Sequence, residues 1–370
     1  MDKLLNARSS KKNLEEEQKP MENIKTLEDV RNSAREKLKG ICGVYKDCDG
    51  DPRRLCQGQS YGRPLGIGGI GSGASFNNNF LALRKYQLKT QLIGNHFEPD
   101  ITYNFFGNEL KMPIMGASIA GVNSFGGESV ISEKDFCRSI VIGCKQAGTI
   151  GWRGDTYTYS LENSYGIDSI AEAGGWGVKI VKPRDQDIIS KFFRKAEKVG
   201  CIAVGIDIDG YGSYAMATHN KPVYKKSVED LRNLINSTEL PVIIKGIMCL
   251  DDAKAAYKAG AAAIVVSNHG GRVLDHTSGT AEILPNITEN MKGKIKIFAD
   301  GGIRTGYDVL KMLALGAEAV LIGRDLIRAA VGAGIEGVRI HMDYLKKTLS
   351  KAMKMTNCQS LKDVDSEILC

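Results

Sequence analysis

Proline is scarce in this 370-residue chain, which has 9 prolines against 42 glycines. Collagen-like and proline/glycine-rich low-complexity chains need both residues in excess, so these classes are excluded. The hydrophobic content of 42% is enough for a large core, which excludes an intrinsically disordered chain. The glycine excess therefore indicates a folded protein whose backbone turns tightly, or approaches something closely, at many places.

Long apolar runs and basic stripes are also absent. No run approaches the roughly 18 apolar residues of a membrane span, and the charged first 30 residues do not resemble a secretory signal. The net charge of +7 comes from basic residues dispersed among acids, without the interleaved aromatics of a nucleic-acid surface. We therefore expect a cytoplasmic protein that binds a small molecule, and neither a membrane nor a nucleic acid.

Paired cysteine motifs are missing as well. The 9 cysteines are an odd number at scattered positions, which indicates free thiols in a reducing compartment. Cys42, Cys48 and Cys56 lie close together in the sequence, but they lack the C-x2-C spacing of a zinc site and have no nearby histidine. We expect no metal site, with a metal or cluster at these three cysteines as the less favoured alternative.

The N-terminal part of the chain differs in character from the rest. Residues 1–25 are polar and are predicted to form a flexible tail, and residues 26–109 a helical and glycine-rich lead-in. Thr26 and Asp29 have capping-box spacing at the start of a predicted helix. The run GIGGIG at 66–71 looks like a dinucleotide-binding loop, but the stretch before it is turn-like and not a strand, so a Rossmann fold is not favoured.

From residue 110 onward, short apolar runs alternate with longer amphipathic segments. The runs are too short and too β-branched for helices, and unbroken apolar runs are typical of strands buried on both faces. The segments between them are long enough for the crossovers that parallel strands require. Eight such units predict an α/β fold, a (β/α)8 TIM barrel over 110–370, rather than a doubly wound sheet. The runs are 113–117, 148–152, 177–181, 203–209, 241–246, 262–268, 296–302 and 319–325.

The ends of these runs are unusually polar. In a barrel of this kind the active site lies at the C-terminal ends of the strands. An ammonium, an imidazole, carboxylates and a guanidinium on one face exceed what packing needs, so they predict an active site there. The residues at these ends are Asp207, Asp209, Lys245, Ser267, Asn268, His269, Asp300 and Arg324.

The last two strand ends carry the pattern of a phosphate site. Gly301, Gly302 and Gly323 remove Cβ atoms where backbone N–H groups at helix starts can face a phosphate, and Arg304 and Arg324 lie beside them. Phosphate sites after the seventh and eighth strands recur in such barrels. The pattern predicts a bound phosphate group.

A second group of residues lies in the sequence SNHGGRVLD at 267–275. His269 is suited to removing a proton from a substrate hydroxyl, and Arg272 to holding a carboxylate in two hydrogen bonds. Asp209 would orient the imidazole. Lys245 is expected to face an anion, because burying it without one would be costly. A Schiff-base Lys245 acting on a phosphorylated substrate stays open as an alternative.

The segments 245–275 and 298–325 resemble the hallmark stretches of the FMN-dependent α-hydroxy acid dehydrogenase/oxidase family, which includes glycolate oxidase and lactate oxidase. Weaker similarity reaches back to about residue 70. The resemblance implies oxidation of a lactate- or glycolate-like 2-hydroxy acid to the 2-oxo acid. His269 would take the hydroxyl proton, the hydride would pass from the α-carbon to flavin N5, and Arg272 would bind the carboxylate.

The resemblance also implies contacts to the cofactor. Lys245 would lie near the N1 and C2 carbonyl edge of the flavin, and the first strand would pass the flavin ring. The resemblance further implies a homo-oligomer. The residues assigned to FMN are Ser118, Ile119, Ala120, Lys179, Asp207, Lys245, Ser267, Asp300, Gly301, Gly302, Arg304, Gly323 and Arg324.

Three departures from the family pattern concern the substrate. Gly69 stands where the family usually has a Tyr, so the glycine run is expected to line a wider substrate mouth. Lys179 and Val181 replace a flavin-contacting Gln and a substrate-facing Tyr. The loop after Asp209 offers no second carboxylate-binding Arg, although the two tyrosines within 211–214 could substitute. These losses keep a second function open, an FMN-dependent isomerase resembling type 2 isopentenyl diphosphate isomerase.

Overall fold

The computed structural model describes residues 24–39 and 68–370. Most of the predicted tail, residues 1–23, lies outside these ranges, as do Cys42, Cys48 and Cys56. The cysteines within the described ranges are all free, as the odd count predicts. No helix in the described parts of the chain combines the length and the apolar character needed to cross a membrane.

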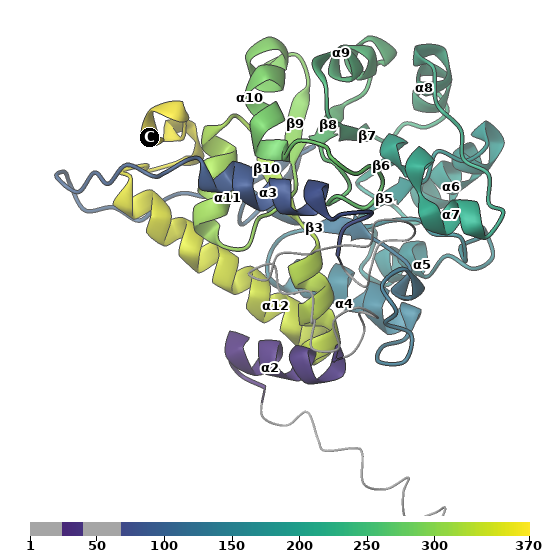
Figure 1. Ribbon diagram of the computed structural model, residues 1–370, viewed down its shortest axis with the longest axis horizontal. Coiled ribbons are helices and arrows are strands. Elements are labelled where there is room, and N and C mark those ends of the chain that lie inside the picture. The colour runs from purple at the N-terminus through teal and green to yellow at the C-terminus, as the bar shows by residue number, and fades with distance from the viewer. Residues whose placement is uncertain (1–23, 40–67) are drawn as a thin grey trace, which may run out of the picture.

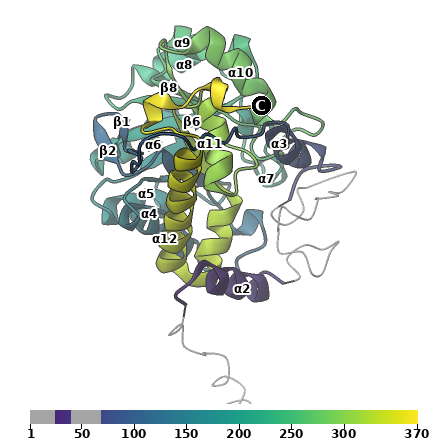
Figure 2. The same cartoon turned by 90° about the vertical axis from the view of Figure 1, so that its left-hand side faces the viewer.

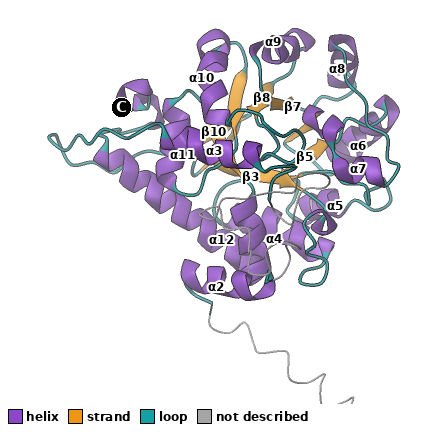
Figure 3. Ribbon diagram, viewed as in Figure 1, coloured by secondary structure: helices purple, strands orange, loops and turns teal. Residues whose placement is uncertain are grey.

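A closed barrel of parallel strands forms the centre of the molecule, and the fold prediction is confirmed (Figure 3). Each strand pairs with the next along the chain, and the last strand pairs with the first in register at Val320 and Ile114. Every predicted apolar run overlaps one strand. The strands are β3 (Ile114–Ile119), β4 (Gly151–Arg153), β5 (Val178–Val181), β6 (Ala203–Asp207), β7 (Val242–Ile247), β8 (Ala263–Val266), β9 (Lys296–Ala299) and β10 (Ala319–Ile322).

Helices cover the outside of the barrel, as Figure 1 shows. Alternate strand residues form two separate apolar layers, with Ile243 in the barrel interior and Ile244 under the helices. The helices are α4 (Glu133–Gln146), α5 (Tyr165–Glu172), α6 (Gln186–Lys198), α7 (Tyr214–Thr218), α8 (Val228–Ile235), α9 (Leu250–Ala259), α10 (Thr280–Met291), α11 (Gly306–Ala314) and α12 (Arg324–Met355). Short 3-10 turns are η1 (Val122–Ser124), η2 (Ile208–Gly212), η3 (Leu361–Asp363) and η4 (Ser366–Ile368).

Helix α2 (Leu27–Lys37) confirms the predicted lead-in helix, and both hydrogen bonds of the Thr26/Asp29 capping box are present. Its buried face lies against α12 near the lower end of the molecule in Figure 2. The Ser33 hydroxyl donates to the Gly332 carbonyl over 2.7 Å. This close approach depends on glycine, because a Cβ at Gly332 would lie 2.4 Å from the Val30 carbonyl oxygen.

A short hairpin that the sequence patterns did not indicate closes the bottom of the barrel. It consists of β1 (Tyr103–Phe105) and β2 (Asn108–Leu110), paired antiparallel. Phe105 is fully buried in the barrel interior, where its ring lies 6.1 Å from that of Trp152 and 5.8 Å from that of Phe298. Aromatic side chains therefore fill this end of the barrel interior, opposite the end where the strands finish.

Candidate active site

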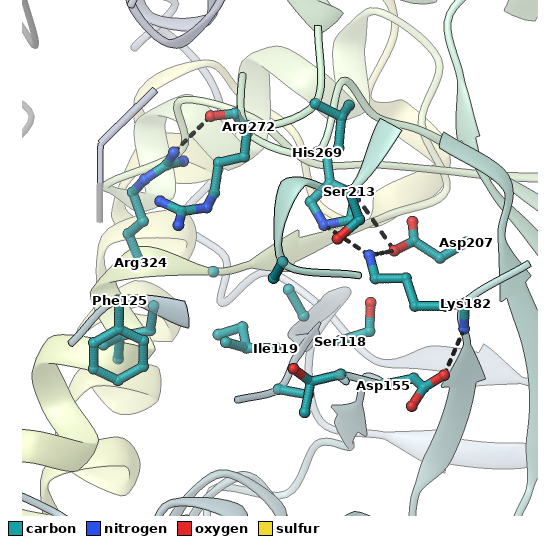
Figure 4. A pocket seen from close by; sticks show the side chains of 18 of the residues that line it. Ser118, Ile119, Phe125, Asp155, Lys182, Asp207, Ser213, His269, Arg272 and Arg324 are labelled. Atoms are coloured by element: carbon teal, nitrogen blue, oxygen red, sulfur yellow. Dashed lines mark hydrogen bonds and ion pairs between the residues drawn. The ribbon is translucent and has the colours of Figure 1, made fainter. Parts of the chain in front are cut away.

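A cavity of about 870 Å³ opens at the C-terminal ends of the barrel strands. Figure 4 looks into it and shows Arg324 and Arg272 on one side, with His269 and Asp207 on the other. The structure thus brings together residues from every strand end that the sequence singled out. The predicted residues that line the cavity are Ser118, Ile119, Ala120, Asp207, Lys245, His269, Arg272, Asp300, Gly301, Gly302, Arg304, Gly323 and Arg324.

His269 follows β8 in a strained backbone conformation. Its φ of 56° is left-handed, and Gly270 and Gly271 follow with φ of 62° and 74°. The buried Asn268 side chain holds this turn, because its Oδ1 accepts from the Asn79 side chain over 2.9 Å and from the Gly271 N–H over 3.1 Å. The turn directs the imidazole into the cavity.

The His269 ring is oriented by a carboxylate behind it. Asp209, in η2, accepts a hydrogen bond from His269 Nδ1 over 2.7 Å. The end of β7 makes room for this contact: Gly246 has a φ of 98°, and a Cβ there would lie 2.7 Å from Asp209 Cγ. With Nδ1 occupied, the other ring nitrogen, Nε2, is the atom that can exchange a proton with a ligand.

Asp207, at the end of β6, lies between several cations. It accepts hydrogen bonds from Lys182 Nζ over 2.8 Å and from Lys245 Nζ over 3.3 Å. Burial opposes its ionisation, but the charges of His269, Lys182 and Lys245 outweigh burial and hold the pKa of Asp207 well below its usual value. Burial and the Asp207 charge raise the pKa of the neighbouring Asp209.

Two carboxylates and an imidazole are also a donor set for a divalent metal. Oxygen atoms of Asp207 and Asp209 and a nitrogen of His269 lie within 4.8 Å of one another. The ammonium groups of Lys182 and Lys245 already provide cations around Asp207. An ion-paired arrangement of this kind suits proton transfer better than metal binding, because the two ammonium groups would repel a divalent cation.

Lys245 is buried among acceptors in the barrel mouth. Its ammonium donates to Ser267 Oγ over 3.0 Å and lies 3.8 Å from an Asp300 carboxylate oxygen. Burial favours the neutral amine, but Asp207, Asp300 and Asp209 outweigh it and raise the pKa of Lys245. The charged form cannot attack a carbonyl, so these surroundings argue against a Schiff-base lysine.

The predicted role of Lys179 is corrected by the direction of its side chain. Along β5, Val178 and Ile180 point into the barrel interior, so Lys179 and Val181 point outward. The Lys179 ammonium donates to the Gly154 carbonyl and lies 5.0 Å from the centroid of the Tyr159 ring. Lys179 does not line the cavity. Its burial lowers its pKa to about 8.

Lys182 is the functional candidate that sequence reasoning missed. It follows β5 at the next inward position after Ile180, and its ammonium reaches the cavity, 3.3 Å from His269 Nε2. Its backbone N–H donates to Asp155 over 3.1 Å, and Asp155 is held by two hydrogen bonds from the buried Arg184. The signal available in the sequence was strand alternation, which places residues 178, 180 and 182 on one face.

Two further predicted residues lie just behind the cavity wall. Ser267 and Asp209 do not line the cavity, although both contact residues that do. Ser267 Oγ accepts from Lys245 Nζ and, over 3.1 Å, from the His269 N–H. Their positions allow them to orient Lys245 and His269 without touching a ligand.

Three glycines, Gly301, Gly302 and Gly323, line the cavity after β9 and β10. We call their backbone, with Arg304 and Arg324 beside it, the cradle. A Cβ at Gly323 would meet nothing within 4 Å, so the backbone at the start of α12 is open to the cavity. Arg304 lies 3.4 Å from the Asp325 carboxylate, and its guanidinium lies over the Phe80 ring. Arg324 lies over the Phe76 ring, 4.4 Å from its centroid. Open backbone with two positioned guanidiniums is an arrangement that suits a phosphate.

The described part of the glycine run, Gly68 to Gly73, does not line the cavity, contrary to the expectation of a substrate mouth. It packs against the His269 loop, where Ile70 N–H donates to the Gly271 carbonyl over 2.8 Å and Ser72 N–H donates to Asp275 over 2.6 Å. A Cβ at Gly69 would lie 2.9 Å from the Phe76 Cβ, which leaves no room for a larger side chain.

Of the two tyrosines considered as substitutes for the missing family contacts, only Tyr214 lines the cavity. Tyr211 is 51% exposed, and the Lys225 ammonium lies 5.7 Å from its ring centroid. The loop after Asp209 therefore supplies one aromatic side chain to the cavity, from the start of α7.

Comparisons with known proteins agree with this geometry. The family model of FMN-dependent dehydrogenases matches residues 66–216 and 213–370. A 4-hydroxymandelate oxidase from Amycolatopsis orientalis is 30% identical, covering 80% of this chain and 89% of its own length. Human 2-hydroxyacid oxidase 1 is 28% identical, covering 79% of this chain and 87% of its own length.

A solved structure has the same fold. The crystal structure of a mandelate oxidase variant with 2-hydroxy-phenylacetamide superposes with a TM-score of 0.73 and 28% identity. The match covers 93% of this chain and 97% of the other. The match therefore extends beyond the barrel alone.

Proposed function

Because the chain belongs to the family of FMN-dependent dehydrogenases, we propose that it oxidises a small, lactate- or glycolate-like 2-hydroxy acid to the 2-oxo acid, with His269 as the base. It is an FMN-dependent oxidoreductase, and relatives named 2-hydroxyacid oxidase and 4-hydroxymandelate oxidase support this substrate class. The observation that carries the proposal is the pairing of His269 with Asp209 over 2.7 Å, in the cavity that Arg272 also lines.

The cavity has the features that FMN requires. The open backbone at Gly323, with Arg304 and Arg324 beside it, would hold the phosphate. The Ser118 hydroxyl at the end of β3 is buried and has no hydrogen-bond partner among the described residues, so it is available to a polar group of a ligand. When bound, FMN supplies the acceptor for the two electrons that leave the substrate carbon.

His269 would remove the proton from the substrate hydroxyl through Nε2. Asp209 fixes the tautomer, with the proton on Nδ1, and would stabilise the imidazolium that forms. Arg272 would hold the substrate carboxylate and so place the hydroxyl beside Nε2. Its Nη1 donates to the Gly68 carbonyl over 2.9 Å, which anchors the guanidinium in the cavity.

Lys245 would hold a fixed positive charge in the barrel mouth. Its raised pKa keeps the ammonium charged, and Asp207, Asp300 and Ser267 restrict its position. A fixed cation at this place would stabilise negative charge that develops on a reduced cofactor. This role needs no proton transfer by Lys245.

An anaerobic reduction assay tests the proposal. The purified protein should show the visible absorption of bound flavin, and mixing with lactate, glycolate or mandelate without oxygen should bleach it. If FMN is bound and none of a panel of 2-hydroxy acids bleaches it, the substrate class is wrong. An FMN-dependent isomerase would give that result, so the same assay separates the two functions.

Location and assembly belong to the same proposal. A cytoplasmic protein is supported by the cysteines of the described ranges, all of which are free. A homo-oligomer is supported by the family resemblance. Light scattering of the purified protein would check the assembly, and a mass equal to that of one chain would contradict it.

A further inference from the structure

We propose that Lys182 binds the reacting oxygen of the substrate, the oxygen that loses its proton to His269. This inference rests on the proposed function. Ile180 points into the barrel interior, so the next residue with the same direction is Lys182, and its ammonium lies in the cavity. From the sequence, Lys179 and Val181 are expected to point inward instead. The family's two hydroxyl-contacting tyrosines are absent from this chain, so this oxygen needs another partner.

The distances place Lys182 beside the proton-accepting atom. Lys182 Nζ lies 3.3 Å from His269 Nε2. Since His269 Nδ1 is engaged by Asp209, the Nε2 lone pair accepts from Lys182 when no substrate is present. A substrate hydroxyl that donates to Nε2 would put its oxygen within hydrogen-bond reach of the same ammonium. Figure 4 shows the Lys182 side chain extending toward Asp207 and His269.

Lys182 is held firmly at both ends. Its backbone is fixed by the Asp155 carboxylate, which is 0% exposed and paired with Arg184 over 2.7 Å. Its ammonium is held over 2.8 Å by Asp207, whose carboxylate is ionised. Lys182 is therefore held in position without a ligand, as a preorganised electrostatic group requires.

The charge has a direct use in the reaction. The O–H bond would break and its proton would go to His269 Nε2. The α-hydrogen would leave with both electrons of the C–H bond, as a hydride that FMN would accept, and the remaining oxygen would become the carbonyl of the 2-oxo acid. Negative charge develops on that oxygen as the proton leaves. Lys182 would stabilise it while keeping its own protons, so it acts as an electrostatic group and not as a second base.

Ligand discrimination provides a test that does not depend on turnover. We would titrate the FMN-loaded protein with pyruvate and with propionate, which lacks the oxygen at carbon 2, and follow the flavin spectrum. Wild type should bind pyruvate more tightly by roughly tenfold or more, since a hydrogen bond from a charged group to the keto oxygen is lost with propionate. Lys182→Met should bring the two dissociation constants to within about twofold.

Rate measurements provide the second readout. Lys182→Met should lower flavin reduction by saturating lactate roughly 10²- to 10³-fold. Lys182→Arg should recover part of the loss because it keeps the charge. Lys179→Met is the matched control: it removes the lysine three residues earlier, on β5, whose side chain points away from the cavity. It should keep both the wild-type preference and the wild-type reduction rate.

The outcomes distinguish a failure of the Lys182 inference from a failure of the proposed function. If Lys182→Met retains FMN and the full preference for pyruvate, Lys182 does not contact the oxygen and the inference is wrong. If Lys182→Met fails to bind FMN, Lys182→Gln is measured instead. Its preference for pyruvate over propionate and its rate of flavin reduction then decide the inference. If no 2-oxo acid perturbs the wild-type flavin and no 2-hydroxy acid reduces it, the proposed function fails, and the inference with it.

Discussion

His269 and Arg304 line the same cavity but differ in what surrounds them, and we propose that His269 serves proton transfer and Arg304 cofactor binding. His269 is engaged by Asp209 and by Lys182, whereas Arg304 pairs with Asp325 at the cradle end. We expect His269→Asn, which tolerates a left-handed backbone, to keep FMN and to lose reduction by 2-hydroxy acids roughly 10²- to 10⁴-fold.

Arg304→Ala should give the opposite result. It removes one of the two guanidiniums at the cradle, so the dissociation constant of FMN should rise, measured by flavin fluorescence on dilution. Protein that is saturated with added FMN should still be reduced by substrate. An equal loss of FMN in both variants would contradict the assigned roles.

Gly302 is a glycine position with two separate requirements. Its φ is 78°, and a Cβ there would lie 2.7 Å from the Asn79 carbonyl oxygen of α3 (Ala74–Arg84). Backbone cannot move aside cheaply, so Gly302→Ala should weaken FMN binding and lower the unfolding free energy by about 1–3 kcal/mol.

Gly293→Ala is the control for Gly302→Ala, because it introduces the same backbone strain without the steric contact. Gly293 has nearly the same φ, 79°, but a Cβ there would meet nothing within 4 Å. We expect a smaller loss of stability than in Gly302→Ala and unchanged FMN affinity, measured by urea unfolding and by flavin titration. A similar effect of both variants on FMN would mean that the contact with α3 has no role.

Residue identities at the strand ends were predictable, whereas one side-chain direction was not. Asp207, Lys245 and His269 lie at or just after the ends of short apolar runs, so their place at the barrel mouth follows from the fold. Lys179 lies in the middle of the run 177–181 and Lys182 directly after it, and a run buried on both faces has no polar alternation to set its register. The register becomes clear only in the folded barrel, where β5 pairs with β6 and Ile180 points inward while Lys179 points outward.

At the scale of elements, the capping box of α11 connects helix stability to the cofactor site. Thr305 Oγ1 accepts from the Asp308 N–H, and Asp308 in turn accepts from the Arg304 N–H over 3.1 Å. Thr305→Ala should lower the unfolding free energy by about 1 kcal/mol. It should also weaken FMN a few-fold, because the Arg304 backbone loses part of its anchor.

Ser227→Ala is the control for this prediction. Ser227 and Asp230 form the same type of capping box at α8, and neither residue lines the cavity. The variant should lose similar stability in a urea titration and bind FMN as wild type does. If Thr305→Ala also leaves FMN affinity unchanged, α11 capping is independent of the site.

Elements with a strong periodic signal were predictable from sequence, and a short one was not. All eight strands and helix α2 lie where apolar periodicity and capping residues put them. The β1–β2 hairpin has only three residues in each strand, too few for a periodic signal. Its role as a plug depends on tertiary contacts of Phe105 with Trp152 and Phe298, which local sequence does not encode.

At the scale of the whole molecule, a buried histidine predicts an acid-sensitive fold. Burial lowers the pKa of His341 on α12 to about 4, with Arg31, Arg304 and Arg328 acting in the same direction and Asp325 opposing them. Between pH 4 and 6.5 the unfolded chain therefore binds a proton that the folded chain does not. Stability should fall as the pH falls through this window, by up to about 3 kcal/mol from this group.

His341→Phe removes the titrating group while keeping an aromatic ring. We expect its unfolding free energy to fall less than that of wild type between pH 6.5 and 4.5, with the two curves parallel above pH 7. Urea titrations at four pH values would measure this. Parallel curves across the whole range would show that His341 does not titrate in this window.

The left-handed backbone at His269 lowers the stability of the folded protein at a residue that the proposed reaction requires. A non-glycine residue at such a φ costs the folded state about 1–3 kcal/mol, and here that residue is the proposed base. His269→Gly should therefore raise the melting temperature while abolishing oxidation. Selection for thermal stability alone would favour glycine at position 269, and only selection for catalysis would keep the histidine.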